Sequence, residues 1–164
     1  MEYFDVFDKN RVFLNYSKIR GDILKHNEYN QGAEIWIINN KKILLTKRSI
    51  NKSHPGMWEV PGGCCKKGET TLNTIVREIK EEIGLAISKE DIIYLNTKLY
   101  KKQFVDIFKT NFNIDTKNIK LQLDEVKDAR FVSKIELYKM MEKNMIVPSV
   151  IERFKMVKDE LDID

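Results

Sequence analysis

Three glutamates lie close together in the middle of the chain, at Glu78, Glu81 and Glu82. On a helix, residues three and four positions apart are neighbours, so these side chains share one arc, and we expect Glu82 to face the surface. Their mutual repulsion is reversed by a hard divalent cation. Mg²⁺ prefers oxygen ligands and completes its shell with water and substrate phosphates. The pattern therefore indicates a site for Mg²⁺, with Mn²⁺ as an alternative ion, although a solvated helix face explains three glutamates at least as well.

The segment from Leu72 to Ile83 has the apolar spacing of an amphipathic helix. Its apolar residues recur at the i, i+3, i+4 and i+7 positions that form one face. Thr70 or Thr71 has the side-chain oxygen that caps a helix start, and Gly84 has the backbone freedom that ends one. We therefore predict a helix that buries one side and carries the glutamates beside it. The apolar residues are Leu72, Ile75, Val76, Ile79 and Ile83.

A wider pattern includes these glutamates. Gly63 is followed after five residues by Glu69, and seven further residues lead to the run Arg-Glu-Ile-Lys-Glu-Glu-Ile-Gly-Leu, from Arg77 to Leu85. This segment resembles the complete Nudix box, which is Gly, five residues, Glu, seven residues and Arg-Glu-apolar-any-Glu-Glu-any-Gly-apolar. Nine defined positions within 23 residues make a chance match improbable. The flanking segment from Gly56 to Gly63 is also similar to that family.

The resemblance implies a fold and a reaction. Nudix proteins are α/β/α sandwiches with a central mixed β-sheet, and the box forms a loop, a helix and a loop. Nudix hydrolases use Mg²⁺ to activate a water that attacks phosphorus in a diphosphate linkage, commonly in a nucleoside diphosphate derivative. The implied partner is therefore a small diphosphate compound. The implied products are two phosphorylated fragments, or a monophosphate with phosphate or pyrophosphate.

The resemblance also implies roles for residues in and beside the box. Glu78 and Glu82 are implied to be the main metal ligands, and Glu81 a further ligand or the base that deprotonates the attacking water. Three further residues are implied to assist at the metal site. For Arg77, an ordinary surface ion pair is the alternative explanation. The assisting residues are Gly62, as a ligand through its carbonyl, Glu69, through water, and Arg77, by orienting a glutamate.

Basic residues near the end of a predicted strand are candidates for phosphate contacts. Arg48 is favoured because a guanidinium binds phosphate through two parallel hydrogen bonds, whereas Lys47 and Lys52 are explained as well by solvation. Glu125 precedes a late strand where Nudix enzymes often have an extra acidic ligand or base, and a plain surface acid is the alternative. Trp58 is expected to pack beneath its loop rather than to stack on a base.

Two other functions stay open. The segment from Arg48 to Trp58 resembles the branch of the superfamily that contains isopentenyl-diphosphate isomerase. Gly62, however, stands where the isomerase has its catalytic cysteine, and Cys64 and Cys65 come two and three positions later. The isomerase also departs from the Arg-Glu-x-x-Glu-Glu run that this chain keeps. A catalytically silent module that binds a nucleotide or an RNA end is the third possibility, although such relatives usually lose box glutamates. Hydrolysis is therefore favoured.

The rest of the chain predicts strands and helices around this centre. An apolar strand over residues 33–38, a turn at Asn39-Asn40 and a second strand over 42–47 are typical of a hairpin. Residues 1–32 are apolar enough to add strands or to form a homodimer surface. Further strands are expected at 92–99, 104–113 and 129–132, and helices at 134–143 and from Pro148 to Leu161.

Composition sets the outer limits of these expectations. The 164 residues, 42% of them apolar, fit a single domain over 1–164. No apolar run approaches the roughly 18 residues of a membrane helix, and no secretory signal is recognised, so we expect a cytoplasmic protein. The two cysteines are adjacent, which excludes a disulfide-stapled scaffold. A net charge of +4, from 29 basic and 25 acidic residues, gives no argument for a specific nucleic-acid partner.

Overall fold

The computed structural model describes the backbone of residues 1–164 and every side chain except that of Thr116. Three α-helices and nine β-strands are assigned, with short 3₁₀ turns at Lys89–Asp91, Thr116–Asn118 and Lys158–Glu160. The helices are α1 (Thr71–Ile83), α2 (Lys134–Glu142) and α3 (Pro148–Val157). The strands are β1 (Tyr3–Phe7), β2 (Phe13–Ile19), β3 (Asn30–Asn39), β4 (Lys42–Arg48), β5 (Trp58–Glu59), β6 (Gly62–Cys64), β7 (Ile93–Tyr100), β8 (Gln103–Asn111) and β9 (Val126–Val132).

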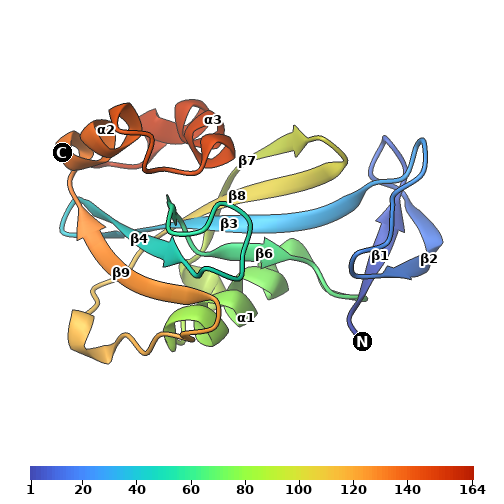
Figure 1. Ribbon diagram of the computed structural model, residues 1–164, viewed down its shortest axis with the longest axis horizontal. Coiled ribbons are helices and arrows are strands. Elements are labelled where there is room, and N and C mark those ends of the chain that lie inside the picture. Colours follow the sequence, from blue (N-terminus) through green and yellow to red (C-terminus); the bar gives the residue numbers. More distant parts are fainter.

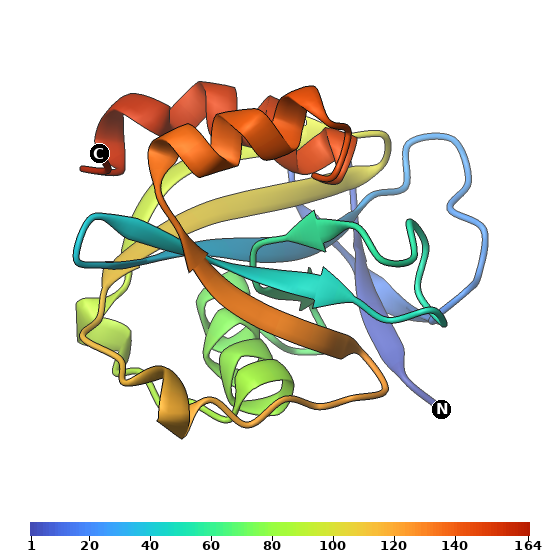
Figure 2. The ribbon, with the colours of Figure 1, turned by 60° about the vertical axis from the view of Figure 1, so that its left-hand side comes forward.

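Seven of the strands form one mixed sheet in the order β5-β4-β3-β8-β7, with β6 paired to β3 and β9 paired to β4. The β3–β8 pair is parallel, and the other pairs of this sheet are antiparallel. Helix α1 covers one face, and α2 with α3 covers the other (Figures 1 and 2). The predicted α/β/α sandwich with a mixed sheet is therefore confirmed.

Strand β3 is covered on both faces, which explains why its sequence is apolar without alternation. Ala33, Ile35 and Ile37 pack in the cluster that includes α1, whereas Trp36 and Ile38 pack in the cluster that includes α2 and α3. A strand covered on both faces buries every side chain, and such strands are continuous apolar runs. The predicted strand at 33–38 is confirmed, and the structure extends it to Asn30–Asn39.

Helix α1 begins and ends where the sequence predicted. The Thr70 hydroxyl accepts a hydrogen bond from the Asn73 backbone N–H at 3.2 Å, which satisfies one of the free donors at the helix start. Gly84 ends the helix with a φ of 72°, a left-handed conformation that glycine adopts without strain. The fully buried side chains of Ile75, Ile79 and Ile83 face the sheet. The helix is thereby fixed in rotation, so its glutamates have defined positions.

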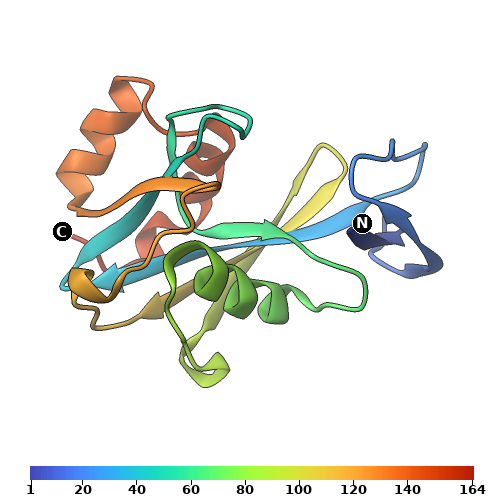
Figure 3. The same ribbon diagram turned by 60° about the horizontal axis from the view of Figure 1, so that its bottom comes forward.

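The first residues form a separate two-stranded sheet, β1 with β2, at one end of the molecule (Figures 1 and 3). Arg11, between these strands, donates to both carboxylate oxygens of Asp106 on β8, at 2.8 and 2.6 Å. Asp106 also accepts from the hydroxyl of Thr71, at 2.6 Å. This buried carboxylate joins the hairpin, the sheet and the start of α1. Of the two expectations for this region, added strands are confirmed, and the homodimer surface stays a prediction.

Other elements differ from the sequence prediction only at their ends. Strand β9 begins at Val126, three residues before the predicted start, because Arg48 at the end of β4 continues the pairing. Helix α3 ends at Val157, and a 3₁₀ turn takes the place of the predicted last helical turn. In the part of the chain that the structure describes, no helix is long and apolar enough to cross a membrane.

Candidate active site

A cleft of about 710 Å³ contains most of the predicted site residues. Its walls come from α1, α3, strands β3, β5 and β6, and the loop that follows β4. Lys47 is not among its lining residues, because its ammonium lies 5.8 Å above the Trp58 ring. Trp58 is buried, which confirms its predicted packing role. The predicted residues that line the cleft are Arg48, Lys52, Gly62, Arg77, Glu78, Glu81 and Glu125.

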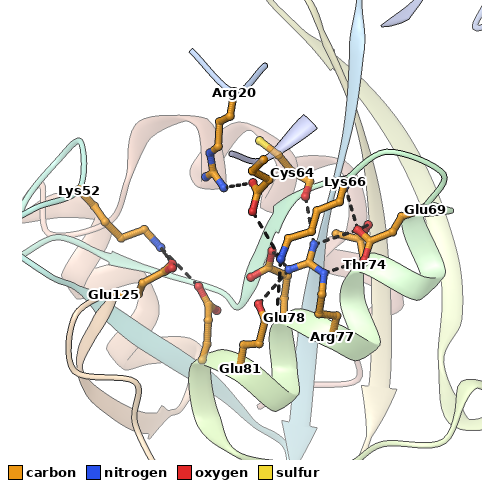
Figure 4. A network of polar contacts seen from close by, with 12 residues as sticks. Arg20, Lys52, Cys64, Lys66, Glu69, Thr74, Arg77, Glu78, Glu81 and Glu125 are labelled. Atoms are coloured by element: carbon orange, nitrogen blue, oxygen red, sulfur yellow. Dashed lines mark hydrogen bonds and ion pairs between the residues drawn. The ribbon is translucent and has the colours of Figure 1, made fainter. Parts of the chain in front are cut away.

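Arg77 is the centre of a hydrogen-bond network on α1 (Figure 4). Its Nη1 donates to Glu78 at 2.8 Å and to Glu81 at 2.9 Å. Its Nε and Nη2 donate to the two oxygens of Glu69 at 2.7 and 2.9 Å, and Nη2 also reaches the Cys64 carbonyl at 3.2 Å. A guanidinium that holds three carboxylates and a backbone carbonyl fixes the helix to strand β6. Arg77 therefore contacts three glutamates, and its predicted role of orienting a glutamate stays a prediction.

Both carboxylate oxygens of Glu69 accept hydrogen bonds. Besides Arg77, it accepts from the Lys66 backbone N–H at 2.8 Å and from the Thr74 hydroxyl at 3.0 Å. Burial by itself raises the pKa of this carboxyl, but the Arg77, Lys66 and Thr74 donors outweigh it and lower the pKa to about 2. Glu69 does not line the cleft. Its geometry is that of a carboxylate that positions Arg77.

Glu82 has the opposite environment. Its side chain is only 2% exposed, and it has one ion pair, from Oε1 to the Lys52 ammonium at 3.4 Å. Its other oxygen, Oε2, is buried without a hydrogen-bond partner in the described part of the chain. Burial raises the pKa of Glu82 to about 8, against the opposing charge of Lys52. One oxygen of this buried carboxyl therefore lacks the donor or cation that normally accompanies a buried charge.

The prediction that Glu82 faces the surface was wrong. The segment before β9 runs across the end of α1, where the backbone N–H of Lys120 donates to the Ile83 carbonyl and that of Gln122 to the Glu82 carbonyl, at 2.9 and 3.0 Å. These contacts cover the last turn of the helix. Of the three clustered glutamates, only Glu81 has a largely accessible side chain, at 44% exposed.

The position of the Glu78 carboxylate depends on the absence of a side chain at Gly63. A Cβ atom placed on Gly63 would lie 2.2 Å from Glu78 Oε1, a distance that carbon and oxygen do not tolerate. A Cβ on Gly62 would lie 2.4 Å from the Ala33 carbonyl oxygen. The two glycines therefore let β6 pass closely between β3 and α1, which places the Gly62 backbone and the Glu78 carboxylate on one cleft.

The comparisons with known proteins agree with this geometry. The NUDIX domain model matches residues 28–154. The chain belongs to the Nudix family. An uncharacterized Nudix hydrolase of Listeria monocytogenes is 30% identical over 151 residues, which cover 90% of this chain and 89% of the relative. The predicted family of hydrolases is confirmed, whereas the isomerase-like branch is not.

Two solved structures show the same Nudix fold. The protein DR0079 of Deinococcus radiodurans has a TM-score of 0.73 at 15% identity, over 89% of this chain and 92% of that one. The Nudix domain of NrtR from Shewanella oneidensis, complexed with ADP ribose, has a TM-score of 0.67 at 16% identity, over 90% and 94% of the two chains. At these identities the likeness establishes the fold alone.

The basic residues of this Nudix site are held by acidic neighbours. Arg48 donates to Glu59 and to the carbonyl of Ser53, both at 2.5 Å, which closes the loop after β4. The Lys52 ammonium lies 3.2 Å from Glu125 and 3.9 Å from Glu59, in addition to its contact with Glu82. Lys52 and Glu125 therefore meet at the site, and Lys52 balances the charge of several carboxylates.

Glu59 is a cleft residue that sequence reasoning missed. It lies on β5 next to Trp58, and successive side chains of a strand point to opposite sides. Because Trp58 was expected to pack inward, the same alternation indicates that Glu59 points the other way, toward the cleft. The adjacent residues Trp58 and Glu59 were therefore the sequence signal from which the position of Glu59 could have been predicted.

The residues of the Nudix box fit a divalent cation. The donors on the cleft are carboxylates and a backbone carbonyl, which is the oxygen set that Mg²⁺ takes. The buried Glu82 Oε2 without a partner is the oxygen that such an ion would satisfy. No group of three acidic, histidine or cysteine side chains is already arranged as a metal cage among the described residues. The reason is that Arg77 and Lys52 are paired with these carboxylates in this structure.

Proposed function

We propose that this Nudix hydrolase is a cytoplasmic enzyme that cleaves the diphosphate linkage of a nucleoside diphosphate derivative by Mg²⁺-dependent attack of water on phosphorus. Mn²⁺ is the alternative ion. The observation that carries the proposal is Glu82, a buried carboxyl that contacts the cleft residue Lys52 and has one oxygen without a partner among the described residues. A fold keeps such a group at a cost in stability, and a bound cation offsets that cost.

Each box residue has a role in this proposal. Glu78 and Glu82 hold the metal, with the Gly62 carbonyl as a further ligand on β6. When bound, Mg²⁺ neutralises the diphosphate oxygens and lowers the pKa of a water. Glu81 is the more accessible of the box glutamates, so it is placed to accept a proton from that water or to complete the metal shell. Arg77, fixed by Glu69, keeps Glu78 and Glu81 in position.

The basic side chains bind the substrate's phosphates. Lys52 lies within 3.9 Å of three carboxylates, on Glu59, Glu82 and Glu125, so its ammonium stays charged and close to the proposed metal. Arg48 has hydrogen bonds to Glu59 and to Ser53, and we assign it the second phosphate contact. The neighbouring acids prevent these cations from binding phosphate so tightly that product is retained. Glu125 remains a candidate for an extra ligand or base.

A screen of diphosphate compounds tests the proposal. The pure protein is incubated with nucleoside diphosphates, nucleoside triphosphates, dinucleotides and nucleotide sugars, with Mg²⁺, with Mn²⁺ or with EDTA, and the products are identified by mass. Cleavage that requires the ion and places ¹⁸O from labelled water on one phosphate is the expected result. Glu78→Gln is expected to be inactive on the same compounds.

Three outcomes contradict the proposed function. Saturable nucleotide binding with no turnover, in the presence of either ion, would instead support the catalytically silent binding module. Isomerisation of isopentenyl diphosphate without release of phosphate would support the isomerase-like alternative. Turnover that persists unchanged in EDTA would remove the metal from the proposal.

A further inference from the structure

A buried ion pair forms the cleft wall away from the box glutamates. Arg153 on α3 donates from Nε to Glu34 Oε2 on β3 at 2.5 Å, and the two side chains are 10% and 5% exposed. The indole N–H of Trp36 donates to the other oxygen of Glu34 at 3.3 Å. Arg153 and Glu34 both line the cleft. None of the residues of the Nudix box takes part in this pair.

The pair presents hydrogen-bond donors to the cleft. Glu34 already accepts a donor on each oxygen, whereas the two Nη groups of Arg153 have no hydrogen bond in the part of the chain that the structure describes. A guanidinium held at Nε keeps its Nη donors in a fixed fork, which matches two adjacent acceptors. Because Glu34 neutralises the charge of Arg153, a neutral ligand edge suits this fork better than another phosphate.

The cleft that contains this fork has apolar lining side chains in addition to the polar ones, and it includes proposed catalytic residues. Buried valine and alanine side chains line the same cleft as the pair, and an apolar lining suits a flat, uncharged ring. In the β3–β6 register Glu34 lies opposite Gly62, so only a glycine separates the pair from the box loop. The whole cleft, about 710 Å³, has the usual size of a small-molecule site. The lining side chains are Ala33, Val60, Val105, Val147 and Val150.

We propose that Arg153, anchored by Glu34, binds the nucleobase of the substrate through two adjacent acceptors, and that the base is guanine. Guanine offers O6 and N7 side by side to an arginine fork, whereas adenine has a donor at N6 next to N7. Cytosine also has two adjacent acceptors, O2 and N3, so CMP is measured beside GMP, and tighter binding of CMP overturns guanine as the base. This deepens the proposed function and rests on it, since it assumes a nucleotide with its diphosphate at the box glutamates. Arg153 is then the residue that determines base specificity.

The experiment compares two ligands that differ in one acceptor. Binding of GMP and of 7-deaza-GMP, which lacks N7, is measured by calorimetry in Mg²⁺ on the wild-type protein. GMP has no anhydride, so the measurement is independent of hydrolysis. We expect 7-deaza-GMP to bind about 5- to 150-fold more weakly, the discrimination of one bidentate arginine contact. AMP, which keeps N7 but has a donor at N6, is expected to be similarly weak.

Two arginine variants locate the effect within the cleft. Arg153→Met keeps much of the side-chain length but removes every donor, so GMP and 7-deaza-GMP are expected to bind with equal affinity. Arg48→Lys is the matched control, because it changes a proposed phosphate contact and should weaken both ligands while preserving their ratio. If Arg153→Met does not fold, the double variant Glu34→Gln with Arg153→Met removes the fork without leaving an unpaired buried charge.

The possible results separate this proposal from the proposed function. Equal wild-type affinities for GMP and 7-deaza-GMP, or no GMP binding, overturn the guanine site even if hydrolysis is observed. Persistent discrimination in Arg153→Met likewise overturns the role of that residue. Conversely, a protein that hydrolyses no diphosphate but discriminates the two ligands through Arg153 retains the base site and loses the proposed reaction.

Discussion

Two carboxylates near opposite ends of α1 have opposite environments. Glu69, just before the helix, accepts four hydrogen bonds from Arg77, Thr74 and the Lys66 backbone. Glu82, in the last turn, has one ion pair with Lys52 at 3.4 Å and one oxygen with no partner among the described residues. The pKa of Glu69 is lowered to about 2, and that of Glu82 is raised to about 8. The two glutamates belong to the same sequence motif.

The difference distinguishes Glu69, a carboxylate that stabilises the fold, from Glu82, a carboxylate suited to binding a ligand. A fully paired carboxylate stabilises the folded state, because each donor favours its charged form. A buried carboxylate without donors destabilises the fold unless a cation is added. The predictions that follow test whether Glu69 and Glu82 differ in this way.

The largest effect is expected from Glu82→Gln on hydrolysis. This isosteric change removes a negative charge from the proposed metal site, and we expect kcat to fall by about three orders of magnitude or more. Steady-state kinetics in Mg²⁺ with circular dichroism of the fold measure this. Near-normal activity in a folded variant would show that the site is elsewhere. Glu69→Gln is the matched control, and its loss should be smaller, because it acts on the metal site only through Arg77.

Gly63→Ala is expected to have the next largest effect. Its Cβ would lie 2.2 Å from Glu78 Oε1, so the glutamate must move away from the cleft. A displacement of about 1 Å in a catalytic group lowers the rate roughly 100-fold. The measurement is kcat/KM beside Cys64→Ala, a change on the same strand that adds no atoms. If both variants are equally active, Glu78 does not need this position.

Glu82→Gln should also stabilise the metal-free protein at alkaline pH. The folded pKa of Glu82, about 8, lies above its ordinary value of 4.5, so folding costs free energy once the unfolded carboxyl ionises. That cost grows from pH 4.5 to pH 8 and is then constant, at roughly a few kcal/mol. Denaturant unfolding in EDTA should show the variant more stable than wild type at pH 8 and equal to it at pH 4. A less stable variant at pH 8 would contradict the assigned environment.

Glu69→Gln should change stability in the other direction. Its folded pKa of about 2 lies below 4.5, so its contribution is fully present above pH 4.5 and is lost as the pH falls toward 2. Allowing for solvent screening, we expect the variant to be less stable by about 1–3 kcal/mol at pH 7. The same unfolding measurements should show the difference closing below pH 4.5. If both glutamine variants shift stability in the same direction, the comparison fails.

The sequence predicted what depends on neighbours along the chain. Helix α1, its Thr70 cap and its Gly84 end follow from local periodicity and capping, and the Nudix box marked the chemistry. What it did not predict depends on distant contacts. Glu82 is buried because the segment before β9 folds over the helix end, and the Glu34–Arg153 pair joins positions 119 residues apart. The residues next to Glu34 and Arg153 in the sequence do not indicate that these two side chains pair.

The smallest effect is expected from the adjacent cysteines. Cys65 is buried, and burial raises the pKa of its thiol to about 11, so it is not a nucleophile at neutral pH. Cys64 lines the cleft, where its sulfur accepts a hydrogen bond from the Gln103 amide at 3.1 Å. Replacing both with serine removes the thiols with only a small change in side-chain shape, and we expect kcat within about threefold of wild type, because carboxylates and a metal carry the proposed reaction. A folded double variant without activity would instead revive the isomerase-like chemistry, in which a cysteine acts on the substrate.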